Sequence, residues 1–353
     1  MSTDSTPPNK PVSGSVWLVL TEDINHQPVF YLDIEITVIK CLCLKPVKFF
    51  RFLVWCILGA QGSVLYADSI VSDDAELVSG GIYRLRAPRS DLLERAIDME
   101  MIRARSSSQT SCTSAQEGFY DDLVDRDVCC VFTGDRITCL ATHIIPFAED
   151  NQLLNEIVTN RQIDIDEDVS DLFDLCDVRN GLLASADIHC YLDKRILAIL
   201  PTPNHILQIE DIPPRAEFRR EPFDEVEYPA GKRFTLQHLV RSTGERALHG
   251  LDAKFKKQTD AKLPSTLLLN YHYGNVAVQQ WGRGWERVLS QRAIGKRGCA
   301  AIAKETTDDD EGPDAGDFIL YCSVNTEAAR KRREDSAKQF NDSINDWRNK
   351  VPG

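Results

Sequence analysis

The sequence lacks the short motifs that define several common enzyme classes. It contains no Gly-x-x-x-x-Gly-Lys-Ser/Thr loop, no His-Glu-x-x-His pair and no Gly-x-Ser-x-Gly elbow, and it shows no internal repeat. Each of these chemistries needs its residue types at a fixed spacing. An ATP-driven enzyme, a peptidase and an esterase therefore have no support from the sequence.

Paired cysteines and long apolar runs are also missing. The 11 cysteines show no Cys-x-x-Cys spacing and follow no secretory signal, so we predict mostly buried free thiols in a reducing compartment. Within residues 45–60, the longest uncharged apolar run extends from Phe52 to Ala60. It is too short to cross a bilayer, and we predict a buried element there. These patterns favour an intracellular protein, nuclear or cytoplasmic, with no signal peptide, transmembrane segment or membrane partner.

Positive charge is scarce. The chain has 41 Lys and Arg against 54 Asp and Glu, which gives a formal net charge of −13 at pH 7. Proteins whose main task is to coat nucleic acid are usually basic, so this balance argues against a pure DNA-binding scaffold. A nuclease is compatible with it, because a local basic rim and a bridging cation can suffice.

The length of 353 residues predicts two or three domains, and the distribution of apolar runs predicts an α+β fold. We expect a disordered tail (1–13), a strand-rich N-terminal domain of unknown role (14–105), a linker (106–124), a central domain (125–214) and a mainly helical C-terminal region (215–353). Short strands are predicted within 16–44, a closing hairpin at 196–200 and 205–209, and helices at 90–105, 234–256 and 267–285.

The central segment contains the residues that point to chemistry. Val131 to Ile145, interrupted by Gly134-Asp135, predicts a hairpin of two short strands, with His143 near the end of the second. An apolar run at 181–184 is followed by a predicted helix over 187–195, which Ser185 or Asp187 would cap.

On that helix His189 and Asp193 are four residues apart, so their side chains share one face. An imidazole nitrogen and a carboxylate in this arrangement can ligate one divalent cation, with water or phosphate in the other positions. His143 would then be free to take a proton from water, and the amide of Asn180 could hold a ring or a loop in place. Each residue also has a purely structural explanation, because a histidine in an apolar run commonly belongs to the core and a helical His/Asp pair is often a surface contact.

The order of these residues resembles the HNH endonucleases. The resemblance rests on Cys130-x-x-Thr-Gly, Ala-Thr-His-Ile-Ile-Pro at 141–146, Asn-Gly-Leu-Leu at 180–183 and His-x-x-x-Asp at 189–193. It is similar to a branch of the family found in fungal and bacterial proteins, and it covers about a quarter of the chain. It implies a ββα-metal fold, in which a hairpin and a helix clasp one metal ion.

The same resemblance implies His143 as general base, Asn180 as the orienting amide, and His189 and Asp193 as metal ligands. It implies a divalent metal cofactor, with Mg²⁺ or Mn²⁺ favoured and Zn²⁺ or Ni²⁺ as alternatives. The implied partner is nucleic acid, with DNA favoured over RNA, and the products would carry 5′ phosphates. No protein partner is indicated.

One position departs from the wider family. Many HNH enzymes carry Asp, Glu or His immediately before the general base as a further ligand, whereas this chain has Thr142. A neutral hydroxyl is a poor ligand, so the metal would have two firm protein ligands unless Asn180 or a carboxylate elsewhere adds one. The acidic stretch Asp164 to Asp177 could supply that carboxylate or shield the site from DNA, although its pattern is typical of a solvated segment packed by an apolar stripe.

The sequence thus predicts a metal-dependent DNA endonuclease. The alternative is a catalytically degenerate domain that serves as an interaction module for nucleic acid or protein. Thr142 and the acidic composition favour the alternative, whereas the presence of His143, Asn180 and His189 together disfavours it.

Overall fold

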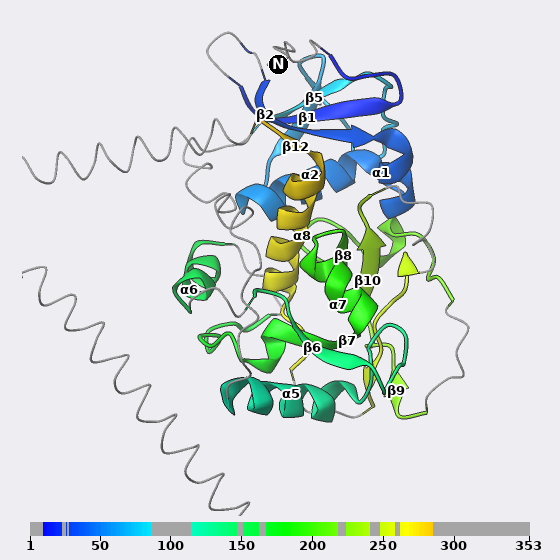
Figure 1. The fold of residues 1–353 in the computed structure, drawn as a ribbon. Helices are drawn as coiled ribbons and strands as arrows, with labels where there is room; N and C mark the ends of the chain where they lie inside the picture. The colour runs from blue at the N-terminus through cyan, green and yellow to red at the C-terminus, as the bar shows by residue number, and fades with distance from the viewer. Residues whose placement is uncertain are drawn as a thin grey trace, which may run out of the picture. The chain divides into compact units, whose positions relative to one another are not determined.

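The chain is described here from a computed structural model. The structure describes residues 10–22, 26, 28–86, 114–146, 151–161, 167–217, 224–240, 248–257 and 262–284. Residues 1–109 and 119–290 form one compact unit, and nearly all described residues belong to it. Helices and strands alternate along this unit, which confirms the α+β class (Figure 1). The helix predicted at 90–105 and most of the predicted tail lie outside the described residues.

A six-stranded sheet is built mainly from the N-terminal part of the chain. Its strands follow the order β12-β2-β1-β5-β3-β4, with bounds β1 Ser15–Glu22, β2 Pro28–Glu35, β3 Ser63–Tyr66, β4 Ser69–Ile70, β5 Ile82–Arg86 and β12 Gly282–Arg283. The central strand β1 pairs antiparallel with β2 and parallel with β5. Strands were correctly expected in this region, but β12 reaches the sheet from more than 200 positions away in sequence.

The strand pattern predicted up to residue 44 is wrong beyond Glu35. Residues Ile36–Leu42 form α1, a helix whose buried side chains are Ile39 and Leu42. These two residues are three apart, which is the spacing of one helical face. Residues 36–42 therefore form a helix in spite of their β-branched side chains, because burial of one helical face outweighs their strand propensity.

The apolar run at 45–60 is buried, as predicted, and it forms a helix. Helix α2 (Pro46–Leu58) begins with proline in its first turn and buries 11 of its 13 side chains. It ends at Gly59, which adopts a left-handed φ of 65°. The buried guanidinium of Arg161 donates to the carbonyls of Cys56 and Ile57, at 2.6 and 3.1 Å, and so pairs two of the orphan carbonyls of the last turn. Among the described residues, no helix is both long enough and apolar enough to span a membrane.

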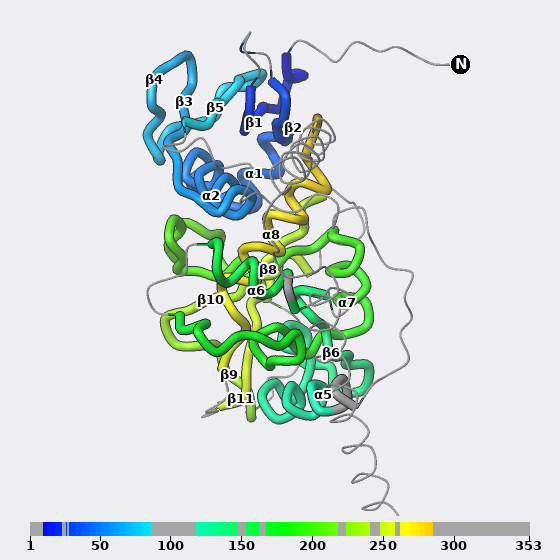
Figure 2. Tube along the Cα trace, turned by 90° about the vertical axis from the view of Figure 1, so that its left-hand side faces the viewer, coloured from blue at the N-terminus to red at the C-terminus, as the bar shows by residue number. Residues whose placement is uncertain are grey.

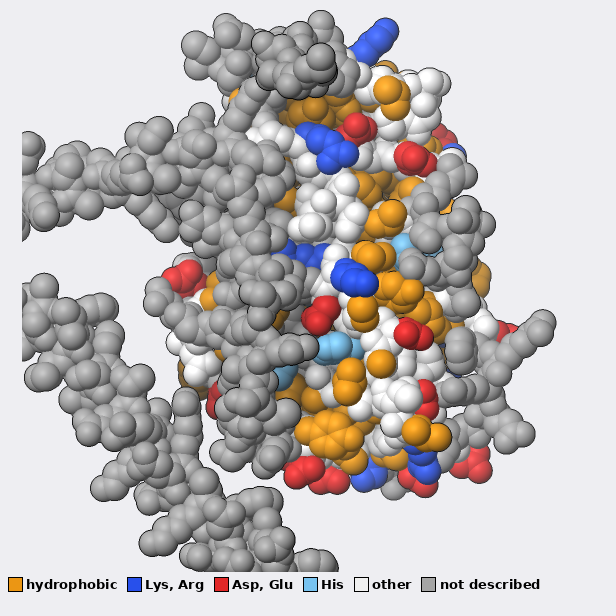
Figure 3. Space-filling view, in the orientation of Figure 1, with side chains coloured by type: hydrophobic (Ala, Val, Ile, Leu, Met, Phe, Trp, Pro, Cys, Tyr) orange, Lys and Arg blue, Asp and Glu red, His pale blue; other side chains and the backbone are white. Residues whose placement is uncertain are grey.

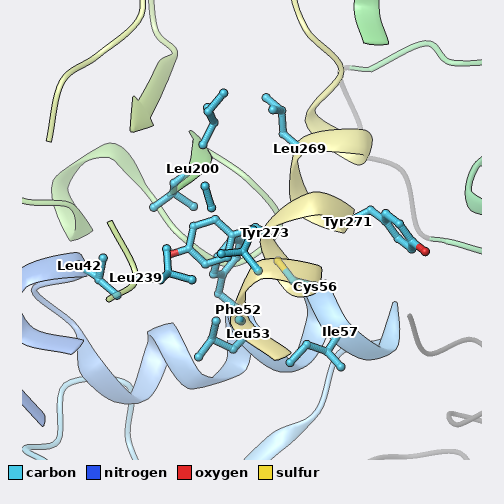
Figure 4. Close-up of a cluster of buried hydrophobic side chains, with 14 of the residues drawn as sticks. Leu42, Phe52, Leu53, Cys56, Ile57, Leu200, Leu239, Leu269, Tyr271 and Tyr273 are labelled. Atoms are coloured by element: carbon cyan, nitrogen blue, oxygen red, sulfur yellow. The ribbon is translucent and has the colours of Figure 1, made fainter. Parts of the chain in front are cut away.

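Helix α8 (Thr266–Trp281) is the packing helix predicted near the C-terminal side of the fold. It contacts α2 and β8 (Leu197–Thr202), and Figure 4 shows Tyr273 of α8 among Phe52, Cys56 and Leu200. One cluster of buried side chains extends from Val16 to Trp281. The predicted N-terminal domain, central domain and C-terminal region therefore contribute to a single hydrophobic core.

Two secondary-structure predictions for the later part of the chain are wrong. The helix expected at 234–256 is replaced by β10 (Arg233–His238), which pairs antiparallel with β8, and by β11 (Phe255–Lys256), which pairs with β9 (Val226–Glu227). The expected hairpin of 196–200 with 205–209 does not form, because β8 takes β10 as its partner. All six residues of β10 are buried, and its polar residues have interior partners: Thr235 donates to Asp252 at 2.6 Å and Gln237 to the Leu42 carbonyl at 2.7 Å.

Candidate functional site

The candidate site is framed by a two-stranded sheet and the helix that follows it. Strand β6 (Cys139–His143) pairs antiparallel with β7 (Gly181–Ser185), so that His143 faces Gly181 across the ladder. Helix α7 (Ala186–Asp193) begins directly after β7 with Ser185 as its N-cap residue, close to the predicted start. Helix α7 contacts both strands; Figure 1 shows it beside β6 and β7, and Figure 2 shows it beside β6.

The hairpin predicted within 131–145 is wrong in its first strand. Residues 131–133 form a turn, which the Cys130 carbonyl closes by accepting from the Gly134 amide at 2.8 Å. The carboxylate of Asp135 then accepts from the Ile137 amide and the Thr138 hydroxyl. These local hydrogen bonds bend the chain, so β6 finds its partner beyond a long insertion that contains α6 (Asn151–Asn160).

Asn180 fastens the loop after β6 to the start of β7. Its side chain is fully buried. The amide oxygen accepts from the Ile145 amide at 2.8 Å, and the amide nitrogen donates to the carbonyls of Ile145 and Leu175, at 3.0 and 2.8 Å. These bonds fix the backbone next to His143.

His143 is the last residue of β6 and lies half-buried against α5 (Ser114–Asp127). Its imidazole stacks on the ring of Phe119, with centroids 4.1 Å apart and planes 16° from parallel. The pKa of His143 is lowered to about 4, mainly by burial and also by the nearby His189, while Asp174 opposes the shift. The ring is therefore neutral at pH 7, as a proton acceptor must be.

We expect the titration of His143 to be displaced strongly towards acid. Its imidazole resonances, followed by NMR as pH is lowered, should show a midpoint near pH 4 instead of the ordinary 6.5, because burial disfavours the charged ring. The His143→Gln protein assigns the signal by its loss. A midpoint at the ordinary value would show that the ring is exposed to water in solution.

Gly181 is needed for steric reasons. A Cβ atom at this position would lie 2.3 Å from the Cζ atom of Phe119, the ring on which His143 stacks. The backbone φ of −157° is ordinary extended geometry, so the constraint comes from space and not from conformation. The Asn-Gly pair thus combines an amide that fixes one loop with a glycine that leaves room for an aromatic ring.

We expect Gly181→Ala to destabilise the protein by about 1–3 kcal/mol, because the added methyl group forces Phe119 out of its position. Denaturant unfolding measures this loss. Gly118→Ala is the matched control, since a Cβ atom there meets nothing within 4 Å and alanine favours the helix. Equal stability of the two variants would contradict the steric argument.

His189 and Asp193 lie on one face of α7, as predicted. The Nε2 atom of His189 is 3.3 Å from the Oδ2 atom of Asp193, and the two side chains are 31% and 52% exposed. The other ring nitrogen, Nδ1, lies 3.0 Å from the hydroxyl oxygen of Thr142 on β6. In Figure 3, pale-blue histidine atoms are exposed over α7 and β6, and red acidic side chains lie beside them. One nitrogen and one carboxylate are thus presented together at the surface, a donor set that fits a divalent cation.

No third protein ligand accompanies this pair in the part of the chain that the structure describes, where no group of three His, Cys, Asp or Glu side chains could hold a metal. Two aspartates of the acidic stretch are engaged elsewhere: Arg179 pairs with Asp171 at 2.7 Å and with Asp177 at 2.6 Å. The apolar stripe predicted for this stretch is buried, apart from the exposed Phe173. The buried side chains are those of Val169, Leu172 and Leu175.

The sequence did not predict the buried ion pair that binds the backbone of β7. Arg126 and Asp127, at the end of α5, are both fully buried and form a bidentate pair at 2.5 and 2.8 Å. Arg126 also donates to the Gly181 carbonyl, and Asp127 accepts from the Leu183 amide, both at 2.8 Å. Adjacent opposite charges in a polar helix carry no periodic signal of burial, so only the packing reveals them.

Comparison with known proteins gives a match to a family model, whereas no curated protein and no solved structure matches this chain. The family model described as HNH endonuclease matches residues 130–200, which include β6, Asn180, β7 and α7. The resemblance to the HNH endonucleases that the motifs indicated is thereby confirmed for residues 130–200.

Proposed function

We propose that this protein is a metal-dependent phosphodiesterase that cleaves nucleic acid, with DNA as the first substrate to test. The HNH endonuclease match supports nuclease activity on nucleic acid. The observation that carries the finer proposal is the grouping of a neutral His143 with the His189 and Asp193 pair. His143 directly follows Thr142 in β6, and the Thr142 hydroxyl lies 3.0 Å from Nδ1 of His189, so the base and the pair are attached to the same end of β6.

His143 is the general base in this proposal. Its neutral imidazole accepts a proton from the water that attacks the phosphorus, and stacking on Phe119 fixes the plane of the ring. Asn180 maintains the backbone on which His143 stands, through its bonds to Ile145 and Leu175.

His189 Nε2 and the Asp193 carboxylate are the groups that would hold a divalent cation, Mg²⁺ or Mn²⁺ first and Zn²⁺ or Ni²⁺ as alternatives. When bound, such a cation polarises the phosphate and stabilises the charge on the leaving oxygen. The partial exposure of both side chains leaves room for water and phosphate oxygens in the remaining positions.

Cleavage of supercoiled plasmid tests the proposal. The purified protein is incubated with Mg²⁺, Mn²⁺, Ni²⁺ or Zn²⁺, beside an EDTA control and the His143→Ala protein. We expect nicking that requires both the metal and His143. If the folded protein cleaves neither duplex DNA, single strands nor RNA with any of these metals, the proposal is overturned in favour of a degenerate domain that serves as an interaction module.

A further inference from the structure

Thr142 occupies a buried position between β6 and α7. Its side chain is 2% exposed. The hydroxyl oxygen lies 3.0 Å from Nδ1 of His189 and 3.3 Å from the carbonyl oxygen of Leu140. A hydroxyl has one proton to donate and lone pairs with which to accept. Thr142 can therefore accept from one of these groups and donate to the other at the same time.

The needs of a metal-bound histidine select one arrangement of these protons. A cation on Nε2 requires the lone pair of that atom, so the ring proton must sit on Nδ1. The Nδ1–H group then donates to the Thr142 hydroxyl, and the hydroxyl donates in turn to the Leu140 carbonyl. Nε2 is left with its lone pair 3.3 Å from the Asp193 carboxylate.

We infer that Thr142 is a positioning residue for the metal site, an inference that rests on the proposed function. Its hydroxyl fixes the ring of His189 in the tautomer and orientation that direct Nε2 towards Asp193. Partners of this kind beyond the ligands are known to control metal affinity, because they set the tautomer and the orientation of the ligating ring. Thr142 is not itself a ligand, since its oxygen faces the ring nitrogen.

A hydrogen bond between Thr142 and His189 allows a site with two protein ligands to tolerate threonine at this position. A third ligand would restrict His189 through the metal, whereas here a hydrogen bond across 47 residues of sequence restricts it directly. The hydroxyl is shielded from solvent, so water does not readily replace it as the partner of Nδ1.

Two substitutions of Thr142 test the role of its hydroxyl separately from the role of its shape. Thr142→Val keeps the β-branched shape that suits a strand and removes the hydroxyl, whereas Thr142→Ser keeps the hydroxyl. Zn²⁺ and Mn²⁺ affinities are measured by calorimetry on the full-length proteins, after thermal unfolding has shown that each variant is folded. We expect Thr142→Val to bind about 10–100-fold more weakly and Thr142→Ser to remain close to the parent.

NMR gives a readout that does not depend on activity. In ¹⁵N-labelled Zn²⁺-loaded protein, we expect a protected Nδ1–H proton on His189 in the parent and in Thr142→Ser, and its loss by exchange in Thr142→Val. Cleavage by Thr142→Val should also recover at saturating metal, as expected when affinity and not chemistry is impaired.

The outcomes distinguish this inference from the proposed function. Metal binding by the parent, with equal affinity and the same His189 signal in Thr142→Val, would overturn the inference alone. Failure of the folded parent to bind Zn²⁺ or Mn²⁺ would overturn the metal-dependent function, and the inference with it.

Discussion

His143→Ala should lower the rate of nucleic-acid cleavage by about 10²–10⁴-fold, the range that a positioned general base contributes. The imidazole is neutral at pH 7 because burial and His189 lower its pKa to about 4, so it is ready to accept a proton. Alanine has no group for this transfer. The rate is measured on supercoiled plasmid at saturating metal, so that loss of chemistry is not confused with loss of metal.

A matched control accompanies this substitution. His26→Ala makes the same chemical change on a histidine that is 84% exposed and paired with Glu22, and we expect no change in cleavage. Metal affinity of His143→Ala should equal that of the parent, because His189 and Asp193 are unchanged. Cleavage by His143→Ala at the parent rate would show that another group activates the water.

The largest effect on stability is expected from Asp127→Ala, with a loss of about 3–5 kcal/mol in the free energy of unfolding. The substitution leaves the fully buried guanidinium of Arg126 without its carboxylate partner, and it leaves the Leu183 amide without the acceptor it has now. A loss of this size is a large part of the stability of an ordinary protein. Urea denaturation of the purified proteins measures it.

Asp122→Ala is the control, because Asp122 is an exposed aspartate on the same helix, and surface substitutions usually change stability by less than about 0.5 kcal/mol. Since Arg126 and Asp127 hold the backbone of β7 at Gly181 and Leu183, we also expect cleavage by Asp127→Ala to fall at temperatures where the parent is stable. A stability loss no larger than that of the control would show that water or another group compensates the buried charge.

The local features of this protein could be predicted from its amino-acid sequence. The helical placement of His189 and Asp193 on one face, the position of His143 at a strand end and the buried helix at 46–58 follow from backbone periods that operate within a few residues. The order of the motifs indicated a resemblance to the HNH endonucleases, and the family model matches the same part of the chain, residues 130–200.

The contacts between these elements became visible in the folded chain. The partner of β6 proved to be β7 rather than the neighbouring residues 131–133, and β10 formed where a helix was expected. Phe119 against His143, Thr142 against His189 and the buried pair of Arg126 with Asp127 join or support positions that no local pattern connects. The physical reason is that periodicity records which face of an element is buried, whereas the partner on that face depends on how the whole chain packs.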